Sequence, residues 1–371
     1  MKFSIQKKTL LTKLQLLSKA VPSRTTLPII GSALFTCKKD TLKIRATDLE
    51  ISINLNCNIE NGEDGCVAMP VGKLLEITNV LPETSVSFTV SDIGKVKIEC
   101  NSGQYTIMGQ SQEEFPAQET IENSQELVIS SEELKEIITN TAYAASKDDL
   151  KPVLQGVLFQ IEKEGFVSVA TDGHRLVKLE KKHLHSLGYT GRVVVPNKFL
   201  SLLLSQLKEK GETSMLIGEN HMQAQIEDIK ITTRIIKDPY PDYEGVIPKD
   251  NTKTLIINRN NFTEAIKRVA IFSNKSSRQV SLALSENSIT ISTEDPENIT
   301  TGKETLDCDY DGEPMTIGYN AYYLKEVLQH QNSDEIKIML KSPLNAGLFI
   351  PIDQNEDIKK TTLLMPIRLN D

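Results

Sequence analysis

The chain has 371 residues, of which 39% are hydrophobic and 25% charged, and its formal net charge at pH 7 is −8. This length suits two or three domains, and the composition is typical of a globular protein. No apolar run reaches the ~18 to 20 residues that a membrane span needs, and Lys7, Lys8 and Lys13 interrupt the apolar residues at the start, which argues against a signal peptide. We therefore expect a cytoplasmic protein with no membrane-bound segment.

The acidic average conceals a basic segment at the N-terminus. Residues 1–39 contain no Asp or Glu and eight basic side chains: Lys2, Lys7, Lys8, Lys13, Lys19, Arg24, Lys38 and Lys39. A protein that is acidic overall can still attract phosphate with one face, because salt confines the field of each patch to roughly 8 to 10 Å.

The sequence contains no motif for a metal or a cofactor. The five cysteines are scattered and form no pair or Cys/His cluster at metal-ligand spacing: Cys37, Cys57, Cys66, Cys100 and Cys308. A P-loop and a dinucleotide-binding glycine motif are also absent from the sequence. We expect no metal and no cofactor.

The sequence repeats itself with a period near one third of its length. Strands predicted at Phe3–Ile5, Leu127–Ile129 and Leu255–Ile257 each lead into a run with helical apolar spacing. Ser130 with Glu133, and Asn261 with Glu264, predict capping boxes for the second and third of these helices, whereas the first copy lacks this signal. Each copy therefore begins with a strand and a helix.

A shared turn and a second helix follow in each copy. Alternating strands end in Thr47-Asp48, in Thr171-Asp172 and, more loosely, in Thr293-Glu294-Asp295. Thr47 and Thr171 are 124 residues apart. Second helices are predicted at Pro70–Leu81, Pro196–Leu207 and Gly318–Leu328.

Copies of this length are whole domains, since solenoid repeats have only about 20 to 50 residues. The polar, turn-rich stretches Ile121–Gln125 and Pro248–Lys253 predict linkers. We therefore expect an α+β protein with three tandem similar domains at residues 1–125, 126–253 and 254–371.

Three similar domains in series are related by a repeated rotation, which either closes into a ring or continues as a spiral. Two chains would close a ring of six domains. In the third copy, residues 258–279 carry one acidic side chain, Glu264, against Arg259, Lys267, Arg268, Lys275 and Arg278. If such helices line the inside and the antiparallel sheets form the outer wall, the ring would contact phosphates without reading sequence. Basic helix faces are also common as plain solvated surface, so a protein-binding hub without a DNA role stays open.

Several short motifs resemble one known family. They are Met1-Lys2-Phe3, Arg24-Thr25-Thr26-Leu27-Pro28-Ile29, Thr47-Asp48-Leu49-Glu50, Ala170-Thr171-Asp172-Gly173-His174-Arg175-Leu176, Tyr240-Pro241-Asp242-Tyr243 and Met365-Pro366-Ile367-Arg368-Leu369. Over essentially its full length the chain resembles the beta subunits of bacterial replicative DNA polymerase, the sliding clamps. The resemblance implies the DNA-clamp fold and a ring-shaped, head-to-tail homodimer around double-stranded DNA. It also implies a non-catalytic accessory subunit of a DNA-directed DNA polymerase, which is a nucleotidyltransferase complex.

The resemblance further implies a hydrophobic pocket between the second and third domains. There the family binds short peptides of the replicative polymerase subunit, the clamp loader and other proteins with a clamp-binding motif. Carried over residue by residue, the pocket would comprise Leu154, Thr171, Gly173, His174, Arg175, Leu176, Pro241, Val246, Leu344, Met365, Pro366, Ile367 and Arg368. Where relatives often have an Arg near this pocket, this chain has Lys151 and Gly245, and it ends with the extension Asn370-Asp371.

The remaining site residues concern DNA and the dimer. We expect DNA contacts from Arg24, which matches the family, and from the basic residues Lys73, Lys151 and Lys198. The head-to-tail contact would join Lys73, Ile107 and Met108 of one chain to Ile271 and Phe272 of the other. These apolar residues could instead be ordinary core residues.

A hydrolase that uses Asp172 and His174 is a further alternative. The sequence has no nucleophile elbow and no metal-spaced second histidine, and Thr47-Asp48 repeats the motif without a histidine. We therefore interpret the Thr-Asp pair as a turn in which Asp accepts hydrogen bonds from backbone N–H groups, and expect no catalytic residue.

Overall fold

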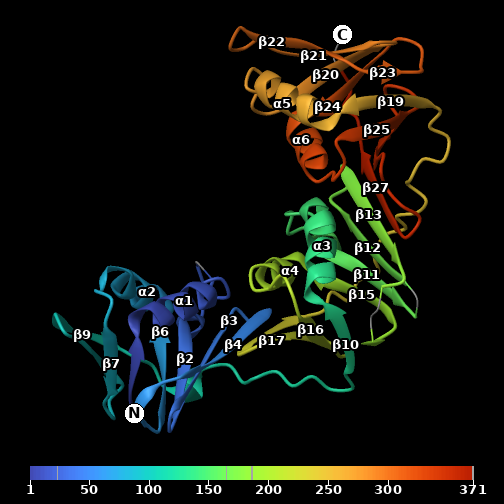
Figure 1. Cartoon of the computed structure of the whole chain (residues 1–371). Helices are drawn as coiled ribbons and strands as arrows, with labels where there is room; N and C mark the ends of the chain where they lie inside the picture. Colours follow the sequence, from blue (N-terminus) through green and yellow to red (C-terminus); the bar gives the residue numbers. More distant parts are fainter. Residues whose placement is uncertain (23, 164, 185–186, 370–371) are drawn as a thin grey trace. The chain divides into compact units, whose positions relative to one another are not determined.

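The computed structural model describes residues 1–22, 24–163, 165–184 and 187–369. Contacts within the chain divide it into two compact units, which are described separately (Figure 1). The first unit comprises Met1–Glu132, Leu187–Tyr189 and Ser201–Ile235, and the second comprises Glu133–Ser186, Thr190–Leu200 and Ile236–Asp371. Among the described residues, no helix is long and apolar enough to cross a membrane.

The same order of elements occurs three times along the chain. The first copy is β1 (Lys2–Gln6), α1 (Lys7–Leu17), β2 (Ser32–Lys38), β3 (Thr41–Thr47), β4 (Ile51–Asn58), β5 (Glu60–Glu63), β6 (Gly65–Pro70), α2 (Val71–Val80), β7 (Ser85–Val90), β8 (Lys95–Cys100) and β9 (Gly103–Met108). The second is β10 (Gln125–Ser130), α3 (Ser131–Thr141), β11 (Gly156–Glu162), β12 (Gly165–Thr171), β13 (Arg175–Lys182), β14 (Leu187–Gly188), β15 (Gly191–Pro196), α4 (Asn197–Leu204), β16 (Glu212–Ile217), β17 (His221–Ile226) and β18 (Ile229–Arg234). The third is β19 (Lys253–Asn258), α5 (Arg259–Ala270), β20 (Gln279–Ser285), β21 (Ser288–Asp295), β22 (Thr300–Asp307), β23 (Asp309–Tyr310), β24 (Met315–Asn320), α6 (Ala321–Gln329), β25 (Glu335–Leu340), β26 (Gly347–Pro351) and β27 (Ile358–Leu364).

The sheets repeat in the same way. The first unit has a five-stranded sheet, β5-β1-β7-β8-β9, and a nine-stranded sheet, β14-β10-β16-β17-β18-β4-β3-β2-β6. The second unit has a nine-stranded sheet, β15-β11-β12-β13-β27-β26-β25-β19-β23, and a four-stranded sheet, β22-β21-β20-β24. Within these sheets, β5-β1-β7-β8-β9, β14-β10-β16-β17-β18 and β23-β19-β25-β26-β27 are the same arrangement three times. The predicted triplication and the α+β class are therefore confirmed.

Each long sheet is joined where one copy meets the next. In the first unit, β4 of the first copy pairs antiparallel with β18 of the second, from Ile51↔Thr233 to Leu55↔Ile229. In the second unit, β13 of the second copy pairs with β27 of the third, from Arg175↔Leu364 to Lys181↔Ile358. In the third copy, β22 is the equivalent of β4 and β13, and in the first copy β9 is the equivalent of β18 and β27. Each of β22 and β9 lies at the edge of its sheet and pairs on one side only, among the described residues.

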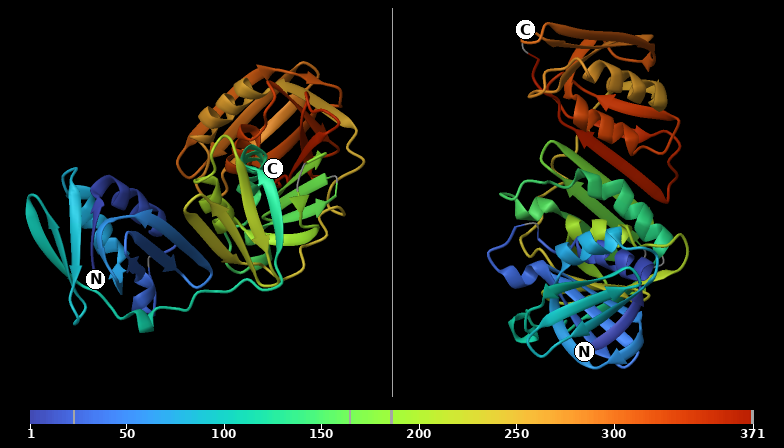
Figure 2. Two further views of the ribbon diagram at one scale, coloured as in Figure 1. Left: turned by 60° about the horizontal axis from the view of Figure 1, so that its bottom comes forward. Right: turned by 90° about the vertical axis from the view of Figure 1, so that its left-hand side faces the viewer.

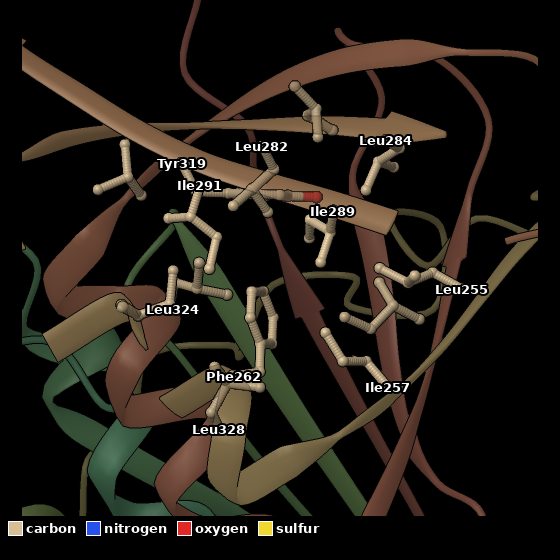
Figure 3. Close-up of a cluster of buried hydrophobic side chains, with 14 of the residues drawn as sticks. Leu255, Ile257, Phe262, Leu282, Leu284, Ile289, Ile291, Tyr319, Leu324 and Leu328 are labelled. Carbon is tan, nitrogen blue, oxygen red and sulfur yellow. The ribbon is translucent and has the colours of Figure 1, made fainter. Parts of the chain in front are cut away.

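Amphipathic helices close the hydrophobic cores. On α5, the buried side chains Phe262, Ala265, Ile266 and Val269 recur at helical spacing and form one face. Figure 3 shows Phe262 between leucines of α6 and side chains from β19 and the β20–β21 hairpin. Truncating Phe262, which is fully buried, to Ala would cost about 3–5 kcal/mol of stability. α5 also packs beside α6, as α1 does beside α2 in the first unit (Figure 1 and Figure 2).

Two details of the helix predictions were wrong. The cap of α5 is Asn258, whose side chain accepts the N–H of Asn261 at 2.9 Å, so Asn261 lies in the first turn and forms no capping box with Glu264. The second helix of the third copy begins at Ala321 and not at Gly318, because residues 315–320 pair with β20 and Asn320 caps the helix. α1, as predicted, begins without a side-chain cap.

A buried lysine ties β27 to α3 within the second unit. Lys360 is 4% exposed, and its Nζ donates to Oδ1 of Asn140 at 2.8 Å and to the carbonyl oxygen of His330. The nearest carboxylate, that of Glu136, is bound to Lys181 at 2.6 Å. Burial lowers the pKa of Lys360 to about 7, against the opposing effect of Glu136.

Because Lys360 has a lowered pKa, we expect the free energy of unfolding to increase with pH. Between its folded pKa and the normal lysine value, the unfolded chain binds more protons, so the free energy of unfolding rises with pH. Between pH 7 and 9 the increase should be about 2 kcal/mol. Above about pH 10 the trend should reverse, because burial raises the pKa of Tyr143 and Tyr319 and their ionisation favours the unfolded chain.

Urea unfolding at pH 7, 8 and 9 tests this prediction in the parent and in Lys360→Met. The variant should lose most of the rise. Lys359→Met, at an exposed position next to it on β27, should keep the rise. If the free energy of unfolding rose equally with pH in all three proteins, the role of Lys360 would be contradicted.

Candidate functional site

The candidate site lies where β13 begins and β27 ends, in the second unit. Arg175 pairs with Leu364 in the β13–β27 ladder, and the N–H of Met365 donates to the carbonyl oxygen of His174 at 2.8 Å. Beyond this, the N–H of Ile367 donates to the carbonyl oxygen of Gly318 at 2.9 Å. Two sequence motifs that are far apart in the chain are thus fixed side by side by backbone hydrogen bonds.

The Thr-Asp motif forms a turn, as predicted. Oδ1 of Asp172 accepts the N–H groups of His174 at 2.9 Å and Arg175 at 3.0 Å, and Thr171 donates to the carbonyl oxygen of Arg175. Thr47-Asp48 makes the same bonds in the first copy, to Glu50 and Ile51. In both copies the Asp carboxylate is used to build a turn.

The side chain of Arg175 is buried and binds this turn. It is 4% exposed, and its three guanidinium nitrogens donate to Oδ2 of Asp172 at 3.1 Å, Oε2 of Glu326 at 2.6 Å and the carbonyl oxygen of Tyr143 at 2.9 Å. It also lies over the rings of Tyr143 and Tyr323. The guanidinium therefore holds the turn, α6 and the segment after α3 together.

A buried apolar cluster lies beneath the other predicted pocket residues. It contains Leu158, Val169, Leu176, Val194, Tyr243, Ala346, Leu348 and Leu363. Three apolar residues within three positions of cluster members in the chain remain exposed: Leu344 at 64%, Val246 at 57% and Met365 at 42%. Leu154, Thr171, Pro366 and Ile367 are half-buried, and Gly173, His174, Pro241 and Arg368 are exposed. An apolar surface with a rigid floor is the arrangement that holds the anchor side chains of an extended peptide.

His174 borders a polar hollow of about 530 Å³. Its ring stacks on Tyr323 of α6 with the centroids 5.6 Å apart. The hollow is lined by Ala145, Ser146, Lys147, Asp148, Lys151, Asp172, His174, Arg175, Lys275, Ser276, Arg278, Asn320, Tyr322 and Tyr323. Backbone hydrogen bonds thus bring the turn at His174 beside the segment that begins at Met365, and a charged hollow borders this turn.

The four predicted DNA-contact residues are all exposed. Arg24 and Lys73 belong to the first unit, and Lys151 and Lys198 to the second. Lys73 forms an exposed ion pair with Glu76 at 2.7 Å. Exposure leaves each of them able to contact a phosphate, although Lys73 must exchange its partner.

Several basic side chains of the helices are paired with carboxylates from other parts of the chain. Lys7 is buried and bound to Glu83 at 2.7 Å, and Lys13 is bound to Asp228. On α5, Arg268 makes two hydrogen bonds of 2.8 Å to Glu304. Acids that are far away in the sequence therefore fold against these cations and pair with them.

The predicted dimer residues lie at the surface and not in a core. Ile271 is 77% exposed, Phe272 43% and Met108 62%, while Ile107 is half-buried. Met108 ends the edge strand β9. Phe272 lies against the edge strand β22, where its ring would be 3.1 Å from a Cβ added at Gly302. The alternative that these are ordinary core residues is wrong for the three exposed ones.

Comparison with known proteins identifies the family. Models of the DNA polymerase III beta subunit match residues 1–119 as its N-terminal domain, 128–242 as its central domain and 244–368 as its C-terminal domain. The beta sliding clamp of Proteus mirabilis is 30% identical over 373 residues, and that of Vibrio cholerae 28% over 371, with both chains fully covered in each case. The chain belongs to the family of bacterial DNA polymerase III beta subunits, the sliding clamps.

Solved structures agree with this assignment. The sliding clamp of Pseudomonas aeruginosa bound to griselimycin has a TM-score of 0.89 at 29% identity, and the clamp of Bacillus subtilis has 0.89 at 27%, again with complete coverage of both chains. The chain is accordingly a DNA sliding clamp with the three-domain clamp fold, and a non-catalytic accessory subunit of DNA polymerase.

The structure of this clamp also shows side chains of the third domain beside His174 that the sequence did not reveal. Tyr323 stacks on His174, and Lys275, Arg278 and Asn320 line the same hollow. The sequence did carry a signal for these residues, because a helix cap, Asn320, is followed by two aromatic residues, Tyr322 and Tyr323. This signal is informative only when α6 is known to begin at Ala321. The terminal Asn370-Asp371 lies outside the described residues.

Proposed function

We propose that two copies of this clamp close head to tail into a ring around double-stranded DNA and tether other replication proteins to it. Each chain would contribute domains at residues 1–125, 126–253 and 254–371. The ring would slide without sequence specificity, as part of a nucleotidyltransferase complex in the cytoplasm. It would need no metal or cofactor of its own.

The edge strands β9 and β22, each paired on one side only among the described residues, carry this proposal. The pairs β4–β18 and β13–β27 join successive copies, and β22 and β9 are the third pair of equivalents. Long edge strands with free N–H and C=O groups are usually covered or paired in proteins. Antiparallel pairing of β22 with β9 of a second chain would continue the repeat, and a second such contact would close the ring.

Exposed apolar residues support the same contact. Met108 stands at one edge and Ile271 and Phe272 near the other, so pairing would remove them from water. Ile107 and Lys73 would complete the interface on the side of the first domain.

DNA binding would rest on phosphate contacts. Arg24, Lys73, Lys151 and Lys198 are exposed cations, and the sequence contains no motif that reads bases. Contacts of this kind hold the duplex weakly at many equivalent positions, so the ring can slide and its affinity falls with salt.

Partner binding would use the surface formed by Leu344, Val246 and Met365 above its buried floor. An extended peptide with Leu or Phe anchors fits such a surface. The partners would be the replicative polymerase subunit, the clamp loader and other proteins that carry a clamp-binding motif.

Retention on DNA of different topology tests the proposal. The purified clamp should stay on nicked circular DNA, once loaded, through a wash at high salt. Once a single cut has made the circle linear, the clamp should slide off the ends before the first measurement can be taken. Equal retention on both forms would indicate surface binding, and no retention on either at any ionic strength would favour a protein-binding hub.

A further inference from the structure

The hollow beside His174 carries an excess of positive charge. Arg175, which lines its wall together with Asp172, is bound to Asp172 at 3.1 Å and to Glu326 at 2.6 Å and so is not an available cation. The other charged residues that line it are four cations, Lys147, Lys151, Lys275 and Arg278, and one carboxylate, Asp148. All five are exposed.

These cations are free to bind a ligand. Among the described residues, no side-chain hydrogen bond or ion pair engages Lys147, Lys151 or Lys275, unlike the paired cations of α1 and α5. Oδ1 of Asp148 accepts the N–H of Leu150 at 3.0 Å, so this carboxylate is partly occupied by its own turn. An anionic ligand would therefore displace no partner from these lysines.

Arg278 is held in place at some conformational cost. Its φ of 50° lies in the left-handed region, which a residue such as Arg rarely adopts. Backbone hydrogen bonds from Arg278 to Asn274 and from Ala321 to Arg278, both 2.8 Å, enforce this conformation. The guanidinium lies 5.4 Å from the ring centroid of Tyr322, which limits its freedom to turn away. A strained, immobilised cation beside a hollow is a frequent sign of a binding role.

The hollow is continuous with the apolar pocket surface. His174 borders the hollow, and its carbonyl oxygen accepts the N–H of Met365. On the other side, the N–H of Leu154 donates to the carbonyl oxygen of Lys151 at 3.0 Å, and the carbonyl oxygen of Leu154 accepts the N–H of Ser146 at 2.8 Å. A peptide whose anchors lie on the pocket would therefore reach the hollow with the residues next to them.

We propose that the hollow binds acidic residues that flank the apolar anchors of partner peptides, so that this clamp selects acid-flanked partners. The inference rests on the peptide-binding role of the adjacent pocket. Exposed charge pairs each contribute little, but several cations facing a short acidic run add up to a gain of about 5- to 20-fold in affinity at low salt. The gain should shrink as salt screens the charges.

Peptide titration tests the inference on the full-length clamp. The probes are one labelled peptide with Leu and Phe anchors, and the same peptide extended by three glutamates, three serines or three lysines at either end. At about 50 mM salt, one glutamate-extended peptide should bind about tenfold more tightly than its serine counterpart, and the lysine-extended one more weakly. Lys275→Gln with Arg278→Gln should remove most of this gain and leave the unextended peptide unchanged.

A matched variant controls for net charge. Lys182→Gln with Lys359→Gln removes two exposed cations outside the hollow and should keep the full gain. No difference between glutamate and serine extensions, or an equal loss in both variants, would overturn the inference. So would a result in which Lys275→Gln with Arg278→Gln weakens binding of a single-stranded oligonucleotide and leaves the acidic peptide unaffected. Failure of the unextended peptide to bind at all would instead contradict the pocket itself.

Discussion

Replacing Ile271 and Phe272 with aspartate is expected to convert the clamp dimer into monomers. Both side chains are exposed, Phe272 lies against the edge strand β22, and in the proposed dimer both would be buried against the partner. Burial of a carboxylate without a partner costs several kcal/mol, so two of them should raise the dimer dissociation constant by about 1,000-fold or more. Sedimentation velocity over a concentration series measures this change directly.

The same variant should also lose topological retention on circular DNA. An open ring has no closed path around the duplex, whatever the strength of its phosphate contacts. Leu344→Asp/Met365→Asp is the matched control, since it places the same two charges at comparably exposed apolar residues. This control should stay dimeric and remain on circles. A dimeric Ile271→Asp/Phe272→Asp variant with unchanged thermal stability would refute the β9–β22 contact.

Replacing Leu344 and Met365 with aspartate is expected to weaken binding of the anchor peptide by about 100-fold or more. Both side chains are exposed, and in the proposed pocket they would contact the anchors beside the buried cluster that contains Leu176 and Leu363. A buried anchor contributes 2 kcal/mol or more, and a charge at its contact point removes that contribution and repels the apolar side chain. Fluorescence anisotropy with a labelled peptide measures the loss.

The two double variants control for each other. Ile271→Asp/Phe272→Asp should bind the peptide with the affinity of the parent, because its substitutions lie outside the pocket. Leu344→Asp/Met365→Asp should still be retained on circular DNA. If both variants lost both properties, a general loss of folding would be the cause, and thermal unfolding would show it. If the pocket variant bound the peptide normally, the pocket residues would have to be reassigned.

Much of the architecture could be predicted from the sequence because repetition is a property of the sequence itself. Strand and helix periodicity recurs in order three times, and the Thr-Asp turn depends only on local geometry, so Thr47-Asp48 and Thr171-Asp172 form the same hydrogen bonds. Helix starts were less predictable where two caps compete. Asn258 and Asn261 are both good caps, and the extent of the β19–β25 ladder, which ends at Asn258, decides between them.

The sequence by itself determined the triplicated fold and the family, and it predicted the segments of the proposed pocket. Only the tertiary structure decided which cations remain without an ion pair and which strands lie at the edge of a sheet. Lys7, Lys13 and Arg268 look like free cations in the sequence and are bound to Glu83, Asp228 and Glu304. Lys147 and Lys275 are far apart in the sequence and line one hollow. The physical reason is that secondary structure and repeats arise from neighbours in the chain, whereas pairing of charges, burial of Arg175 and the open edges of β9 and β22 arise from residues that meet only when the chain folds.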